Sequence, residues 1–489
     1  MNKKILLLSA GLLCALLASA QDPLSILRFS RLSPHGSARS TAMGGAFGAL
    51  GGDLSAIHVN PGGVGVFRAS EFNITPYLDF DKTKAVDKES TSAFRIGNMG
   101  IVLNFPFRSG IRRGINFAFN YVNMNNFNRN ILQYGGVNAE SSLIDVWGAQ
   151  ANGYTTDKLR DEAWLAYETA LIDLRENSND EYKSQLYRGD RVEQERYITE
   201  RGYQGEYVFS VGVNFSDKFY VGGSLGSQII KYTYHSQYWE GVRSDTSILD
   251  EFTHDVVFET TGSGVNLKVG AIYRPVSFLR LGLAIHTPTY YKLSAYNENG
   301  IESFFNTPPL KDQPWTQLDK SVTSEYDYHL QTPWRFISSI ALVLNKRFIL
   351  SADYELVDYP SADLQDTYHG EYDWIREFLE ANTRRAHNFR VGTEFRVNSL
   401  LSLRGGYAYQ GAPYARGDWN EKNHLQSLST GAGFNFGNFY TDVAYLYKTA
   451  TDTDYFYSHH TDDGKLFSSK KIETTLRNQE FRCSFGVKF

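Results

Sequence analysis

The sequence predicts an all-β fold: a fourteen-stranded antiparallel transmembrane β-barrel plugged by an N-terminal hatch. Three observations carry this prediction. Stretches in which apolar and polar residues alternate recur from residue 71 to the C-terminus, and such alternation places one strand face in an apolar medium. The composition combines 32 Tyr, 32 Phe and 42 Gly with only 13 Pro, which suits many strands bearing aromatic girdles. After residue 20, no segment approaches the roughly 20 apolar residues that a membrane-spanning helix needs.

The first residues, 1–20, have the features of a secretory signal peptide. Lys3 and Lys4 precede an apolar run at 5–17, which is too short to span a bilayer as a mature helix. An Ala-Ser-Ala cleavage site follows, so we expect the exported chain to begin at Gln21. The formal net charge is −5 and no basic patch is present, so no nucleic-acid partner is expected.

The joints between the fourteen predicted strands fall into two classes. Some are tight, and every other joint is long and polar. Tight turns at one end and long loops at the other are typical of outer-membrane barrels, in which the tight turns face the periplasm. The predicted strands are 71–80, 93–107, 113–125, 203–216, 218–236, 253–274, 278–294, 320–345, 347–358, 384–398, 400–412, 424–437, 438–449 and 472–489, and the tight joints are 108–112, 216–217, 274–277, 345–346, 398–399 and 437–438.

The last predicted strand also carries a targeting pattern. Residues 481–489 alternate strictly and stop on an aromatic residue, Phe489, which resembles the C-terminal signal of bacterial outer-membrane barrels. We therefore expect the barrel-assembly machinery to recognise this strand and to insert the protein into the outer membrane of a Gram-negative bacterium. Taken alone, the pattern would also suit the edge strand of a soluble sandwich, but the number of strands and the tight joints favour the barrel.

Charged residues on the predicted strands are expected to face the lumen, because a charge that faces lipid at mid-depth costs about 2–4 kcal/mol. They have both signs. Two arrangements fit this mixture: a paired network that holds a segment in place, or the wall of a water-filled pore. The predicted lumen network is Arg280, Arg390, Glu394, Arg396, Arg404 and Asp442, with Lys268, Asp353, Glu355 and Arg482 as further members.

Residues 21–69 precede the first predicted strand and lack sustained alternation. They are rich in small residues, as expected of a segment that folds into a barrel too wide to be filled by its own side chains. Within them, Asn60-Pro61-Gly62-Gly63 predicts a type II turn, in which Pro61 presets φ and Gly62 takes the left-handed position. We expect Asn60, Pro61 and Gly62 to reverse the chain at the edge of this hatch.

The stretch ARSTAMGGAFGALGGDLSAIHVNPGGVGVF, residues 38–67, resembles the hatch of the FadL/TodX family, outer-membrane transporters of long-chain fatty acids and aromatic hydrocarbons. That family carries an Asn-Pro-Ala motif inside a fourteen-stranded barrel; Asn60 and Pro61 match it, and Gly62 replaces the alanine. The resemblance implies uptake of hydrophobic compounds and their release through a lateral gap in the wall into outer-membrane lipid. We further expect movement of the hatch around 55–65 to accompany release.

The barrel, 70–489, carries a long outer loop at about 126–202, in which DKLRDEAWLAYETALIDLRE predicts an amphipathic helix with Thr156 as its N-cap. Two uses fit its apolar stripe: a capture groove at the barrel mouth, or packing over the neighbouring loops, which is the commoner use of such a stripe. The stripe consists of Leu159, Ala163, Trp164, Tyr167, Leu171 and Leu174.

The motifs do not favour an enzyme. Residues 222–226 match G-x-S-x-G, but that nucleophile motif needs a strand-to-helix turn, and here the strand pattern continues. No residue pattern supports a metal site or a cofactor. Three function classes remain: passive uptake of hydrophobic compounds such as long-chain fatty acids; alternatively a FadL-like barrel that serves type IX secretion as a protein-docking component; and a lipolytic or proteolytic barrel, which the motifs favour least.

Overall fold

The computed structural model describes residues 25–33, 36–85, 88–107, 111–186, 190–244, 246–309, 314–366, 370–371, 373–460 and 466–489. The predicted signal peptide, 1–20, and the start of the predicted hatch, 21–24, lie outside these residues. Within them, no helix is both long enough and apolar enough to cross a bilayer.

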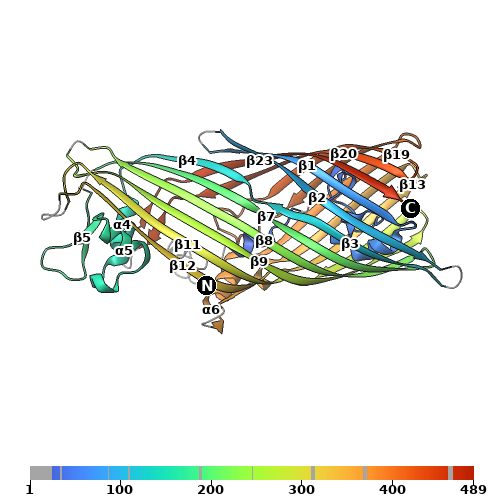
Figure 1. Ribbon diagram of the computed structural model, residues 1–489, viewed down its shortest axis with the longest axis horizontal. Helices are drawn as coiled ribbons and strands as arrows, with labels where there is room; N and C mark the ends of the chain where they lie inside the picture. The colour runs from blue at the N-terminus through green and yellow to red at the C-terminus, as the bar shows by residue number, and fades with distance from the viewer. Residues whose placement is uncertain are drawn as a thin grey trace.

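One sheet of 19 strand segments closes on itself as a barrel of 14 antiparallel strands, because the last strand, β23, pairs with β1 (Figure 1). Four barrel strands consist of two successive segments that lie end to end: β3 with β4, β10 with β11, β12 with β13, and β14 with β15. The segments are β1 (Glu71–Lys84), β2 (Lys88–Pro106), β3 (Arg112–Asn126), β4 (Arg129–Asn138), β7 (Val192–Phe215), β8 (Phe219–Val242), β9 (Leu249–Val276), β10 (Leu279–His286), β11 (Tyr290–Phe305), β12 (Gln317–Gln331), β13 (Trp334–Leu344), β14 (Phe348–Asp358), β15 (Asp363–Asp366), β16 (Gly370–Glu371), β17 (Arg385–Arg396), β18 (Leu401–Gln410), β19 (Leu425–Phe436), β20 (Phe439–Asp454) and β23 (Ile472–Lys488).

The predicted fold class is therefore confirmed. Two of the predicted strands each correspond to a barrel strand that consists of two successive segments. Prediction 278–294 corresponds to β10 followed by β11, and prediction 320–345 to β12 followed by β13. The joint predicted at 81–92 is wrong, because β1 and β2 continue through it and leave only a short connection. Its residues are polar on both strand faces, so alternation gave no signal there.

Outward-facing side chains form an apolar band at the end of the barrel that carries the tight turns. On β8, outward Phe219 and Leu225 are exposed apolar residues, and Lys231 is the first outward charge. About 9–11 residues of a tilted strand span a bilayer. Strands β7, β8 and β9 have 24, 24 and 28 residues, so their upper parts extend beyond the membrane. The elongated barrel in Figure 1 therefore has a membrane-embedded turn end and a protruding loop end.

The tight turns lie where the joints predict them at 216–217, 345–346, 398–399 and 437–438, whereas residues 108–110 of the first predicted joint lie outside the described residues. Ser216, Asp217, Asn345 and Lys346 all have left-handed φ angles between 48° and 57°, as two-residue hairpin turns require. The turn between β9 and β10 lies slightly later than predicted, at 277–278.

The N-terminal segment forms the plug. Its short helices are α2 (Ser25–Ser30), α3 (Ala38–Ala42), η1 (Leu54–His58) and η2 (Pro61–Val66). Figure 1 shows the blue segment inside the turn end of the barrel, and its apolar residues from Ala38 to Phe67 are buried apart from half-buried Val66. Helix α3 packs against β18, β19, β20 and β23, whereas η2 packs against β3, β7, β8 and β9. The hatch therefore contacts opposite sides of the wall.

An insertion between β4 and β7 caps the loop end (teal, Figure 1). It contains α4 (Leu143–Ala151), η3 (Thr156–Lys158), α5 (Asp161–Glu168), β5 (Ile172–Leu174) and β6 (Tyr182–Ser184). Because β4 and β7 continue as strands, the insertion proper is shorter than the predicted loop at 126–202. The other outer elements are η4 (Tyr359–Ser361), α6 (Asp373–Asn382), β21 (Ser458–His460) and β22 (Leu466–Ser468).

Candidate functional site

The Asn-Pro-Gly motif caps a short helix and contacts the wall. The Oδ1 atom of Asn60 accepts a hydrogen bond from the Gly62 amide at 2.9 Å, and Pro61 occupies the first helical position of η2. The Nδ2 atom of Asn60 donates to Gly48 O within the hatch at 2.6 Å and to Ala271 O of β9 at 3.1 Å. The Asn60 side chain thus connects two parts of the hatch to each other and to the barrel wall.

The predicted type II turn is wrong in its detail. Gly62 is not among the residues with positive φ. A Cβ atom on Gly62 would instead lie 2.9 Å from Ala271 Cα and 3.0 Å from Gly270 O. Glycine is needed here because the hatch backbone approaches the wall closely, and the alanine of the family motif would clash at this position.

Wall glycines repeat this close approach around the lumen. On seven strands, an added Cβ atom would come within 2.0–2.6 Å of a hatch atom, whereas real Cβ contacts below 3.0 Å are essentially absent from proteins. The partners are mostly hatch backbone atoms, which no side-chain rotation can move aside. This glycine ring comprises Gly212, Gly222, Gly270, Gly282, Gly392, Gly406 and Gly431.

Ion pairs add a second set of contacts between hatch and wall. Arg39 of the hatch binds Glu394 at 2.9 Å, and Glu394 also binds Arg404 at 2.7 Å. Arg404 binds Asp442 at 2.6 Å. Arg280 donates to Leu50 O of the hatch at 2.6 Å.

Arg390 and Arg396 are the two remaining charges of the predicted lumen network, and they lie in different environments. Arg390 is buried and pairs with Glu355 at 2.5 Å, and Arg335 shares the same carboxylate at 3.0 Å. Arg396 is exposed at the turn end of β17, away from these pairs. Arg396 occupies an inward position of the alternation, as predicted. Because this is the last inward position of β17, it lies beyond the hatch and faces water.

A third cluster involves a hatch histidine. The Nδ1 atom of His58 lies 2.8 Å from Glu206 of β7, and Lys268 Nζ of β9 lies 2.5 Å from the same carboxylate. Asn120 is 3.2 Å from His58 Nε2. The sequence placed Lys268 in the lumen, but it did not indicate Glu206 as its partner, because β8 separates β7 from β9 in the barrel.

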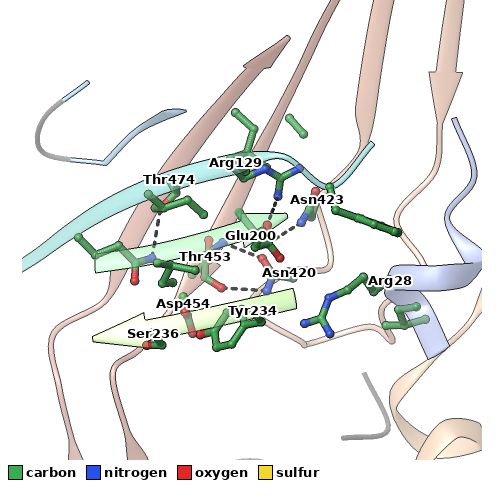
Figure 2. A pocket seen from close by; sticks show the side chains of 18 of the residues that line it. Arg28, Arg129, Glu200, Tyr234, Ser236, Asn420, Asn423, Thr453, Asp454 and Thr474 are labelled. Atoms are coloured by element: carbon green, nitrogen blue, oxygen red, sulfur yellow. Dashed lines mark hydrogen bonds and ion pairs between the residues drawn. The ribbon is translucent and has the colours of Figure 1, made fainter. Parts of the chain in front are cut away.

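A cavity of about 630 Å³ lies above the hatch, in the protruding half of the barrel. Its volume is within the usual range for sites of small ligands. Figure 2 shows Arg28 of α2, Arg129 of β4 and Glu200 of β7 around one space, with Arg129 and Glu200 3.3 Å apart. Charged and amide side chains line part of it, both next to the hatch, as with Arg28, and beneath the insertion, as with Gln150 and Glu162. Apolar side chains line the rest, among them Phe127, Ile131, Leu143, Val146, Trp147, Ile198, Tyr238, Val256, Phe258, Phe378 and Phe456.

The predicted outer-loop stripe does not line this cavity. Helix α5 ends at Glu168, and Ala170 has a φ of +54°, so Leu171 and Leu174 lie beyond the helix. Leu159, Ala163 and Leu171 are buried in the core of the insertion, and Trp164, Tyr167 and Leu174 are partly buried against it.

The cavity is instead lined by α4, which the sequence reasoning missed. A signal was present: Ser142 and Asp145 form a capping box ahead of an apolar run. Leu143, Val146 and Trp147 of this helix face the cavity.

The wall beside the cavity is interrupted. Among the described residues, β2 before Asn98 forms ladder pairs with β1 only, and β4 forms them with β7 only. The chain bulges at Asn123–Asn125 and breaks between β3 and β4. In the described chain, side-chain bonds replace the missing ladder, including one from Thr91 Oγ1 to Asn128 O at 3.3 Å. Outward Phe94, an exposed apolar residue, lies on this part of β2.

Comparison with solved structures identifies the architecture. A FadL homologue of Pseudomonas aeruginosa superposes with a TM-score of 0.57 at 14% identity, covering 94% of this chain and 99% of its own. This chain has the fold of FadL-type barrels. The toluene transporter TbuX of Ralstonia pickettii gives 0.52 at 15% identity, and TodX of Pseudomonas putida gives 0.51 at 10% identity. Both comparisons cover 94% of this chain and 99% of the other.

The FadL-type resemblance of the sequence is thus confirmed at the level of the fold. No family model matches the sequence, and the search of curated proteins gave no significant match.

Proposed function

We propose that this protein is a passive outer-membrane transporter of hydrophobic compounds in a Gram-negative bacterium, with long-chain fatty acids among its substrates. The observation that carries the proposal is the partly apolar cavity, which lies above a closed hatch and beside an interrupted wall. TbuX and TodX, which share this fold, are toluene transporters. Their function supports hydrophobic compounds as the cargo of this protein.

A sheltered path is what such a compound needs. Each methylene removed from water contributes about 0.8 kcal/mol, so a sixteen-carbon chain gains on the order of 12 kcal/mol by avoiding the aqueous phase. A water-filled pore offers no such gain. A partly apolar cavity that opens toward the bilayer does.

Release is proposed to be lateral, through the gap between β2 and the β3–β4 junction. The glycine ring and the Arg39–Glu394 pair hold the hatch against the wall, so the path toward the turn end stays blocked. Asp79 and Asp81 of β1 and Arg129 of β4 line the cavity and lie near the gap. The cavity therefore borders the interruption itself.

A reversible block of the gap tests this route. In a Thr91→Cys, Asn128→Cys double variant, oxidation is expected to join the two edges and to abolish uptake of labelled oleate by whole cells. Reduction is expected to restore uptake, and each single variant serves as a control. Unchanged uptake by the oxidised double variant would refute lateral release.

The hatch motif Asn60, Pro61 and Gly62 is proposed to keep the plug seated, and the C-terminal strand ending at Phe489 to direct assembly into the membrane. Docking of exported proteins in type IX secretion would leave the cavity without a role. Mass spectrometry of the natively purified barrel separates the two functions, since bound lipid supports transport and co-purified secretion components support docking.

A further inference from the structure

Four basic residues gather on the neighbouring strands β23, β1 and β2 (Figure 1). Lys82 lies directly opposite Arg477 in the ladder between β1 and β23, and Lys84 lies directly opposite Lys88 in the ladder between β1 and β2. All four residues are exposed. Like charges in directly opposite positions destabilise a sheet. These four residues, called the basic cluster below, therefore lower the stability of the wall unless an anion lies between them.

The basic cluster faces the outside of the barrel. Asn478, next to Arg477, donates a hydrogen bond to Asp79 in the lumen, and Thr83, between Lys82 and Lys84, is buried. Because successive side chains point to opposite faces of a strand, the bases point outward. Within the described part of the chain, none of the four has an ion-pair partner. The described outward positions next to them carry uncharged side chains: Phe80, Ser90, Thr449, Thr475 and Gln479.

The cluster begins where the apolar band of the wall ends. On β1, every outward residue from Phe72 to Phe80 is apolar, and Lys82 is the first outward charge. On β23, the outward residues from Val487 back to residue 479 carry no charge, and Arg477 is the first that does. About 9–11 residues of a tilted strand span a bilayer, which matches the spacing on both strands. The bases therefore lie at the membrane surface on the loop side.

Aromatic rings lie next to the basic cluster on its membrane side. Phe80 and Phe481 pack edge to face with their ring centroids 6.2 Å apart, and the ring of Phe481 lies 5.0 Å from that of Tyr445. Aromatic girdles of this kind mark the two interfaces of a membrane barrel. A ligand that covers this part of the wall thus meets positive charge at its head and apolar rings along its chains.

We propose that the basic cluster binds a phosphate group of an acylated glycolipid in the outer leaflet, with the acyl chains lying on Phe80 and Phe481. Phosphate suits the cluster, because arginine can bind it with two parallel hydrogen bonds and lysine binds it as a point charge. Lys88 lies on the strand that borders the wall gap, so the bound lipid lies beside the proposed exit. This inference rests on the outer-membrane location and is independent of whether the barrel transports cargo.

Retention of lipid A by the purified full-length barrel tests the proposal. The barrel is incubated in a nonionic detergent with diphosphoryl lipid A or with the same lipid after removal of both phosphates, and bound lipid is counted by native mass spectrometry. We expect the phosphorylated form to be retained at least about tenfold more. Excess inorganic phosphate is expected not to displace it, because free phosphate lacks acyl chains. Equal retention of the two lipids, or displacement by inorganic phosphate, would overturn the inference.

Two double variants show whether the cluster is the cause. Lys82→Gln, Arg477→Gln removes one opposed pair and is expected to lower retention at least about tenfold, because each base beside an anionic lipid contributes about a factor of five. Lys158→Gln, Lys183→Gln removes two exposed bases from the insertion and is expected to leave retention unchanged. Equal retention by the two double variants would overturn the inference.

Thermal unfolding without added lipid checks the repulsion within the cluster. The Lys82→Gln, Arg477→Gln barrel is expected to unfold at the same temperature as the unsubstituted barrel or at a higher one, because two like charges no longer face each other. Diphosphoryl lipid A is expected to raise the unfolding temperature of the unsubstituted barrel only. A lower unfolding temperature of the double variant without lipid would contradict the repulsion from which the inference starts.

Discussion

A single methyl group on the glycine ring is expected to unseat the hatch. Gly222 of β8 faces the lumen, and a Cβ atom there would lie 2.2 Å from Pro61 O, 2.6 Å from Pro61 C and 3.0 Å from Gly62 N. All three are backbone atoms. In a Gly222→Ala variant, η2 must therefore move away from the wall as a unit.

The size of the effect follows from the contacts at η2. Overpacking in a dense interior costs about 1–3 kcal/mol. If η2 moves, Asn60 also loses its hydrogen bond to Ala271 O of the wall, at about 1 kcal/mol. A combined cost near 3 kcal/mol raises the population of unseated hatch roughly a hundredfold, since 1.4 kcal/mol corresponds to a factor of ten.

Single-channel recording in planar bilayers measures this population as ion conductance. The unsubstituted protein is expected to stay closed, and Gly222→Ala is expected to show frequent openings. Gly223→Ala is the matched control, because the next residue on the same strand points outward and its added Cβ would meet only Lys268 O at 3.9 Å. If Gly222→Ala conducts no more than Gly223→Ala, the glycine ring does not hold the hatch.

Three further substitutions probe the remaining contacts. Asn60→Ala removes the cap of η2 and both bonds from its amide, so we expect a loss of about 2–3 kcal/mol in hatch stability and faster proteolysis of the hatch; equal cleavage rates would contradict this. Arg404→Ala leaves buried Asp442 without its guanidinium partner and Glu394 with Arg39 alone, and it is expected to cost about 3–5 kcal/mol in thermal unfolding, whereas exposed Arg396→Ala is expected to change it by less than about 0.5 kcal/mol. Burial raises the pKa of Glu162 in α5 to about 7, so the folded insertion holds a proton that the unfolded chain releases near pH 4.5, and its stability is full below pH 4.5 and falls by up to about 3 kcal/mol as the pH rises through 7. Protease cleavage of the insertion should accelerate from pH 5 to pH 8, and Glu162→Gln should abolish the difference; the same acceleration in the variant would assign it to another group.

The strands of the barrel wall and their inward faces could be predicted from the sequence, because one simple rule governs a membrane barrel. Outward positions meet lipid and inward positions meet the lumen, so alternation alone placed Arg404, Glu394 and Asp442 on the inner face. The rule is informative only where lipid is present. It failed on the upper part of β1 and β2, where both faces meet water and the strands continue through an expected loop.

Contacts between the hatch and the wall were not predictable in the same way. A glycine in a strand has no side chain to alternate, so the sequence does not distinguish Gly222, which faces the hatch, from Gly223, which faces outward. Gly62 illustrates the same point, since a plausible turn type explained a residue whose real constraint is the backbone of β9, more than 200 positions away. Such constraints become visible only when both segments are placed in space.

The use of the amphipathic stripe could not be decided from the sequence for a related reason. Periodicity shows that one face of a segment is apolar, but it does not show what that face contacts. The stripe of α5 packs into the insertion core, whereas the shorter α4 contributes Trp147 to the cavity.

A hatch that is seated on seven strands constrains how cargo can leave. Seven close approaches and the Arg39–Glu394 pair would have to break together for the plug to move as a body, and each requires the loss of packing or of a buried ion pair. Opening the gap beside β2 requires far less free energy, because only side-chain hydrogen bonds such as Thr91 to Asn128 cross it in the described chain. At about 1 kcal/mol for each such bond, opening the wall is the cheaper route by several kcal/mol. The proposed lateral route therefore does not require the expected movement around 55–65, and in that proposal the hatch acts as a fixed floor beneath the cargo.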